Sequence, residues 1–272
     1  KTTAAAFSVL IKNFRTQMKP SGPAPDGKDK AAIKKLQADI DKKLEEDKNG
    51  ILSATKVTID EIKENLTRDA TAAKAQITEE TRIETDNKII ILTNEANAKK
   101  DIINNKSKAE ESTASLDEKA VALKEIAVID ATLKADLKNA LIDAKAKIDK
   151  ATAEIDANLE ANKTIQDLGI TAESLREITW KVAGATIEKA KADPDTAIKN
   201  KLKDIEEEAN TVAQREARKA DNDASENIAK ERENAQEIIK SKNTKIENDT
   251  NSQKEQVKVA LKSEMITQIT TI

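Results

Sequence analysis

The sequence lacks the residues on which most enzyme chemistry and zinc binding depend. Its 272 residues include no cysteine, no histidine and no tyrosine. The chain therefore has no thiol nucleophile, no disulfide, no imidazole base and no zinc site built from nitrogen and sulfur ligands. Its five glycines are scattered, which excludes glycine-rich phosphate loops and dinucleotide motifs. We predict a protein that is not an enzyme, with no catalytic residues, no metal site and no cofactor.

Aromatic residues and long apolar runs are also scarce. Phe, Trp and Tyr make up 1% of the chain, which leaves almost nothing on which nucleic-acid bases or sugar rings could stack. The 47 basic and 50 acidic residues are interleaved, so no basic face for nucleic acid stands out. The longest apolar runs, such as residues 89–92, fall far short of the roughly 20 residues that a membrane-spanning helix needs. We expect no nucleic-acid partner and no transmembrane segment.

The residues that are abundant predict long helices. Apolar residues recur every three or four positions, and two series can be followed in steps of eleven. The first series is Leu202, Ala213, Ala224, Ala235, Ile246 and Val257, and the second is Ile126, Leu137, Ile148, Leu159 and Ile170. Eleven residues in three turns is about 3.67 per turn, close to a straight helix. We therefore predict an all-α fold of long helices that form an elongated antiparallel bundle or coiled coil with eleven-residue (hendecad) periodicity.

Glycine and proline divide the chain into five predicted parts. Residues 1–19 are a short apolar docking segment, and residues 20–28 are a Pro/Gly linker that holds three of the four prolines. Residues 29–166 are predicted to form a helical rod with a hairpin near 104–115, residues 167–193 a short helical cap, and residues 194–272 a long C-terminal helix.

Four local signals predict helix ends or helix starts within the chain. Asn49-Gly50 is a favoured turn or helix end, and Gly169 followed by Thr171 predicts a helix stop and a new N-cap. Ser115 and Glu118 have the spacing of a capping box. Asp193-Pro194 fits an N-cap followed by proline at the first helical position.

The predicted helices are long, and the seam between them, meaning the apolar positions at which neighbouring helices meet, is narrow. At 1.5 Å per residue, helices over 51–104 and 116–166 would each reach roughly 75–80 Å, and one over 194–266 roughly 110 Å. Many seam positions are Ala, Thr or Asn, so little apolar area is buried per residue. We expect stability to come from helix length, from partner helices, or from both.

Two apolar groups are candidates for partner contacts. The segment 1–19 carries Phe7, Leu10, Ile11 and Phe14, flanked by basic residues, and fits either docking onto a neighbouring subunit or an amphipathic membrane contact. Trp180 is the only tryptophan. It lies in a compact apolar stretch near two glycines and is either a binding hot spot or a packing plug where a short helix folds over the end of the bundle, and we favour the plug.

The acidic clusters and sequons favour simple interpretations. Residues 206–208, 45–47 and 110–111 are acidic clusters, and basic residues three or four positions away indicate solvated, salt-bridged helix faces instead of metal or catalytic sites. Asp221 opens an EF-hand-like pattern, but Glu226 stands where that loop requires glycine. Four Asn-X-Ser/Thr matches begin at residues 65, 105, 162 and 248, and such matches arise by chance in this composition.

The stretch ADLKNALIDAKAKIDKATAEIDANLEANKT within residues 116–168 resembles the helical repeat stalks of Gram-positive cell-wall surface proteins, as does KADPDTAIKNKLKDIEEEANTVA. The resemblance implies an extracellular spacer that holds a binding tip away from a cell. Since the chain begins with Lys1, we expect a processed or excised segment, with any signal peptide or wall anchor outside it.

These patterns predict a structural protein. We expect a rod that serves as a stalk, fibre or filament subunit, extracellular or at the cell surface, and self-associating into a homo-oligomer or filament. Three alternatives stay open: an amphipathic protein that binds lipid surfaces, a helical pore-forming toxin component, and a desiccation-protective chain. Liposome flotation, lysis of red cells and a cooperative thermal melt would respectively discriminate them.

Overall fold

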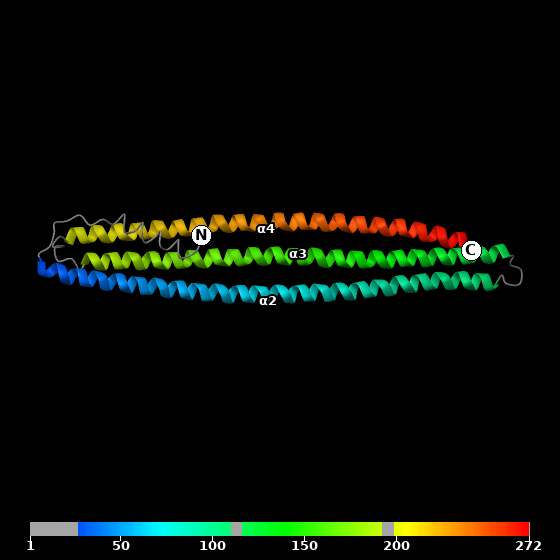
Figure 1. The fold of residues 1–272 in the computed structure, drawn as a ribbon, viewed down its shortest axis with the longest axis horizontal. Helices are drawn as coiled ribbons and strands as arrows, with labels where there is room; N and C mark the ends of the chain where they lie inside the picture. Colours follow the sequence, from blue (N-terminus) through cyan, green and yellow to red (C-terminus); the bar gives the residue numbers. More distant parts are fainter. Residues whose placement is uncertain (1–26, 110–115, 192–198, 272) are drawn as a thin grey trace. The chain divides into compact units, whose positions relative to one another are not determined.

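The computed structural model describes residues 27–109, 116–191 and 199–271, and all of them are helical (Figure 1). Helix α2 covers Gly27–Ala109 with 83 residues, α3 covers Leu116–Lys191 with 76, and α4 covers Lys199–Thr271 with 73. No strand occurs within these three ranges. The predicted all-α fold is therefore confirmed, whereas residues 1–26, 110–115 and 192–198 lie outside the described part.

Two predicted helix ends are wrong. Helix α2 continues through Asn49-Gly50, and α3 continues through Gly169 and Thr171, so no separate short helix begins at 167. None of the described glycines has a positive φ, so none adopts the conformation of a helix C-cap. One interior glycine costs a helix only about 1 kcal/mol relative to alanine. Packing on both sides of each glycine outweighs that cost.

The other predicted boundaries agree in part. Helix α2 begins at Gly27, inside the predicted linker, and runs to Ala109, past the predicted start of the hairpin loop at 104. Helix α3 begins at Leu116, directly after the predicted cap Ser115, which lies outside the described residues together with Asp193-Pro194.

The chain forms two compact units, and each takes a part of all three helices. Unit 1 comprises Lys1–Thr67 and Glu160–Asn234, and unit 2 comprises Arg68–Leu159 and Ala235–Ile272. In unit 1 the core is a cluster to which every helix contributes. Its buried members are Leu44, Ile178, Val182, Ala183, Ala209, Val212 and Ala213.

Unit 2 has a core of a different composition. Its buried hydrophobic residues, within the described ranges, are all alanines: Ala96, Ala131, Ala135, Ala140, Ala153, Ala157 and Ala235. Larger side chains such as Ile148 and Ile246 are only half-buried. Alanine at these positions lets the helix backbones approach closely but removes little apolar area from water. Unit 2 is therefore held by many small contacts.

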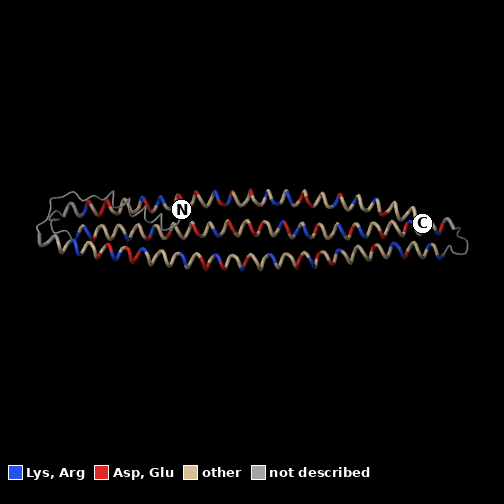
Figure 2. The backbone as a smooth tube through the Cα atoms, viewed as in Figure 1, with Lys and Arg blue, Asp and Glu red and all other residues tan. Residues whose placement is uncertain are grey.

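Ion pairs join the helices within each unit. In unit 1 the pairs between helices are Asp41–Lys189, Asp47–Lys181, Lys63–Asp167, Arg176–Asp221 and Lys191–Glu206. In unit 2 they are Lys74–Asp156, Glu84–Lys147, Lys100–Asp130, Lys134–Glu264, Asp143–Lys254 and Lys150–Glu247. Figure 2 shows that basic and acidic residues are interspersed along every helix, so residues of both signs are available for such pairs.

The predicted apolar series lie on the covered side of their helices. On α4, Ala213 and Ala235 are buried, and Ala224, Ile246 and Val257 are half-buried. On α3, all five members of the series from Ile126 to Ile170 are half-buried. Leu202 lies among residues whose side chains are not described.

Candidate functional site

Acidic residues of the clusters 45–47 and 206–208 lie on helix faces and form ion pairs with lysines. Glu45 pairs with Lys48 on the same helix, and Asp47 reaches Lys181 of α3 at 3.8 Å. Glu206 lies 3.5 Å from Lys191 of α3. The predicted salt-bridged interpretation is confirmed for these residues, whereas residues 110–111 lie outside the described part.

Metal binding and membrane crossing find no support in the described residues. Within 27–109, 116–191 and 199–271 no group of acidic side chains is placed to hold a metal ion. Asp221, the first residue of the EF-hand-like pattern, lies inside α4 and pairs with Arg176 at 3.4 Å. No described helix has a stretch that is both long and apolar enough to cross a membrane.

Trp180 is not a packing plug. It is 46% exposed on α3, whereas its neighbours Ile178 and Thr179 are fully buried. Since α3 is continuous here, the tryptophan projects from the outer face of a long helix. The interpretation of Trp180 as a partner contact remains a prediction. The other four candidates, Phe7, Leu10, Ile11 and Phe14, lie outside the described residues.

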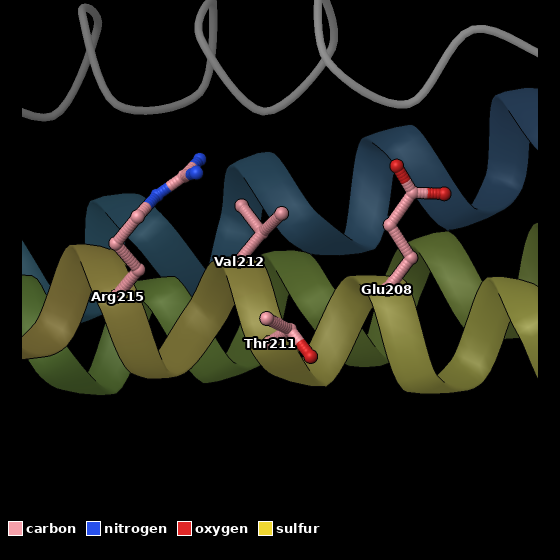
Figure 3. Close-up of a pocket in the computed structure, with 4 residues that line it drawn as sticks. All are labelled: Glu208, Thr211, Val212 and Arg215. Carbon is pink, nitrogen blue, oxygen red and sulfur yellow. The ribbon is translucent and has the colours of Figure 1, made fainter.

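A groove on α4 in unit 1 was not predicted from the sequence. It has a volume of about 590 Å³ and is lined by Glu208, Thr211, Val212 and Arg215. Figure 3 shows the side chains of Glu208, Val212 and Arg215 rising on one side of the helix, with the valine between the two charged residues. The lining therefore holds one buried valine of the unit 1 core between a carboxylate and a guanidinium group.

A second groove lies in unit 2. Its volume is about 460 Å³, and its lining is Ile103 of α2 with Val121, Lys124, Glu125, Val128 and Ile129 of α3. Val121 is 55% exposed, and the adjacent Leu123 is 56% exposed. The groove is an apolar surface without the converging polar groups that orient a ligand in a binding or catalytic site.

Two buried hydroxyls link α2 to α3 in unit 1. The oxygens of Thr55 and Ser174 lie 2.6 Å apart, and both residues are 7% exposed. Thr55 also donates to the carbonyl of Ile51 at 2.6 Å. A hydroxyl has one proton, so Ser174 donates to Thr55. This chain of two hydrogen bonds fixes the register between the helices.

Thr81 in unit 2 is a buried hydroxyl without a partner. It is 2% exposed, and its oxygen makes no hydrogen bond within the described residues. Replacing Thr81 by valine keeps the shape and removes a polar atom whose burial costs about 1–3 kcal/mol. We expect Thr81→Val to raise the free energy of unfolding by about 1 kcal/mol in urea titrations.

Thr78 provides the matched control for that substitution. Its side chain is exposed, and its hydroxyl donates a hydrogen bond to the carbonyl oxygen of Lys74 at 2.8 Å. Thr78→Val should leave the free energy of unfolding nearly unchanged, because no buried polar atom is removed. Equal effects at Thr78 and Thr81 would contradict the assignment of an unsatisfied hydroxyl.

Ion pairs on exposed helix faces shift a few pKa values. The hydrogen bond from Arg82 lowers the pKa of Glu79 below its ordinary 4.5, and that from Lys230 does the same for Glu226. The hydrogen bond to Glu264 raises the pKa of Lys134 above 10.5. All these groups are exposed, so their shifts reflect surface pairing, in contrast to the buried carboxylates typical of catalytic sites.

The lowered carboxylate pKa values predict acid sensitivity. A group whose pKa is lower in the folded state stabilises the fold above its unfolded pKa, and this contribution is lost as the pH falls through the folded pKa. We expect the melting temperature to decline as the pH falls below about 4.5. The Glu79→Gln/Glu226→Gln variant should show a smaller decline in melts followed by circular dichroism. An identical decline would show that these two pairs do not contribute.

Comparisons with protein-family models, with curated proteins and with solved structures find no match for this chain.

Proposed function

We propose that this chain is a non-enzymatic structural protein, an elongated helical rod that serves as a stalk, fibre or filament subunit and associates with itself. The observation that carries the proposal is the kind of contact that holds the helices together in both units. In both units small apolar residues form most of the buried face, and charged residues pair across neighbouring helices. Such a pattern can be repeated over any length of helix.

The order of the ion pairs supports antiparallel packing within each unit. In unit 1, Asp41 of α2 pairs with Lys189 of α3, whereas Lys63 pairs with Asp167. The number on α3 therefore falls as the number on α2 rises. In unit 2, Lys134 and Lys150 of α3 pair with Glu264 and Glu247 of α4 in the same falling order.

The spacing of buried positions supports the eleven-residue repeat. In unit 2, Thr81, Leu92 and Ile103 of α2 are all buried or half-buried. Each follows the previous one by eleven residues, which returns to the same helix face after three turns.

Reversing one ion pair tests the antiparallel register. Lys63→Asp places two carboxylates opposite each other, and we expect it to lower the free energy of unfolding by about 0.5–1 kcal/mol, since both partners are partly exposed. Adding Asp167→Lys should restore most of the loss in urea titrations. Additive losses in the double variant would contradict the register in unit 1.

Direct imaging tests the function. Electron micrographs of the purified chain should show thin rods, and sedimentation velocity should show larger species as the concentration rises. Compact particles at every concentration would contradict the proposal. Flotation with liposomes at physiological salt would instead favour the lipid-binding alternative. The extracellular location rests on the resemblance to wall-protein stalks and remains a prediction.

A further inference from the structure

The exposed tryptophan of unit 1 is left open by the glycine one turn after it. Trp180 is 46% exposed, although α3 fully buries the two residues before it, Ile178 and Thr179. Side chains on a helix lean toward its N-terminus, so the residue four positions after Trp180 is the one that would cover its ring. That residue is Gly184, which is exposed and has no side chain.

Neither packing nor backbone conformation explains Gly184. A Cβ atom placed on it would meet nothing within 4 Å, so no neighbour requires a glycine at this position. Its φ is not positive, so any residue could adopt its conformation. A glycine inside a helix is also less favourable than an alanine. What Gly184 leaves is an uncovered face on the ring of Trp180.

The surface next to the tryptophan is acidic. Glu177 lies one turn before Trp180 on α3, and Glu173 lies one turn before Glu177. Both side chains are exposed, and neither forms an ion pair with another described residue. The open ring therefore lies beside carboxylates whose charge is not neutralised.

The two nearest basic residues are held by other helices. Arg176 lies 3.4 Å from Asp221 of α4, and Lys181 lies 3.8 Å from Asp47 of α2. Both cations are thus engaged at the sides of α3, where it meets its neighbours. The place of a cation beside the ring is left to another molecule.

We propose that this face of α3 binds an arginine side chain from a basic peptide segment of a partner protein. Its guanidinium group stacks on the ring of Trp180 and pairs with Glu177. Tryptophan is the aromatic residue that attracts cations most strongly, and arginine can stack on a ring while it donates to a carboxylate. Tryptophan and arginine are also the residues most enriched at binding hot spots. This binding site goes beyond the proposed rod and does not depend on self-association.

The fluorescence of Trp180 reports binding directly, because the chain has no other tryptophan. The full chain is titrated with a hexa-arginine peptide at physiological salt. We expect a saturable change in emission with a midpoint below about 1 mM.

Gly184→Leu separates binding from stability. The leucine should cover the ring and weaken binding about fivefold, although it raises the melting temperature because it removes a helix glycine. Gly169→Leu is the matched control, since Gly169 is exposed on the same face eleven residues earlier and a Cβ atom there also meets nothing. A side chain at 169 leans away from Trp180, so this variant should be stabilised in the same way and bind as before.

Glu177→Gln tests the carboxylate and should weaken binding about threefold. Glu61→Gln removes an equal charge from an exposed position of α2 in the same unit and should leave binding unchanged. Circular dichroism should show the long helices intact in all four variants.

Four results would overturn the proposal. The first is the absence of a saturable change in emission, and the second is an equal loss of binding in Gly184→Leu and Gly169→Leu. The third is an equal loss in Glu177→Gln and Glu61→Gln, which would show non-specific attraction between charges. The fourth is a change in the emission of the unliganded chain when Lys12, Arg15 and Lys19 are replaced by glutamine, which would assign the face to the chain's own basic segment.

Discussion

Replacing Ile178 by alanine is expected to lower the free energy of unfolding of unit 1 by about 2–5 kcal/mol. Ile178 is fully buried in the cluster that joins α2, α3 and α4. Truncation removes buried methyl groups and leaves a cavity, and the neighbouring Val182 and Val212 cannot fill it without moving a helix. Elsewhere in the described core most buried residues are alanines, so few other positions have so much to lose.

The fluorescence of Trp180 provides the measurement, because the tryptophan lies two residues along α3 from the substituted position. Urea titrations of Ile178→Ala should show an earlier transition. Leu36→Ala, at a residue of α2 in unit 1 that is 46% exposed, is the control and should change stability by less than about 1 kcal/mol. A loss at Ile178 no larger than that at Leu36 would contradict the assignment of this cluster as the core of unit 1.

Replacing Ala140 by leucine should destabilise unit 2 by about 1–3 kcal/mol or more. Ala140 is 3% exposed in a core whose described buried hydrophobic residues are all alanines. A leucine at a close helix contact forces the backbones apart and separates the neighbouring alanine contacts as well. The apolar area that the leucine buries is therefore outweighed by the packing contacts that neighbouring alanines lose along the helix.

Ala75→Leu is the matched control, since Ala75 is exposed on α2 in the same unit. Leucine and alanine have similar helix propensities, so this change should be close to neutral. Thermal melts followed by circular dichroism compare the two variants. If Ala140→Leu raised the melting temperature, the seam of unit 2 would be loosely packed, and the account of its stability would be wrong.

The helices could be predicted from the sequence because the apolar spacing is regular over long distances. The series from Ala213 to Val257 identifies one covered stripe of α4, and each member is buried or half-buried. Single-residue signals were weaker guides. Gly169 predicted a helix end, but α3 continues through it, since buried residues such as Ala172 and Ile178 hold the helix on the C-terminal side.

The contacts between helices could not be predicted because they depend on the register. Thr55 and Ser174 are 119 residues apart, and nothing local distinguishes either from the exposed threonines and serines nearby. Val212 was missed for the same reason, since a single valine in a polar stretch gives no sign of a groove. Trp180 was noticed as a singular residue, but the side of the helix on which it lies depends on how α3 packs.

Small-angle scattering of the purified chain tests the central claim most directly. If the chain is a rod about 120 Å long, its radius of gyration should be about 35 Å. A compact globule with the same number of residues would have a radius of gyration of about 19 Å. A value near 35 Å, with a scattering curve typical of a thin cylinder, is the result predicted for a structural spacer. A value near 19 Å would contradict it and would direct the search for function to an enclosed site.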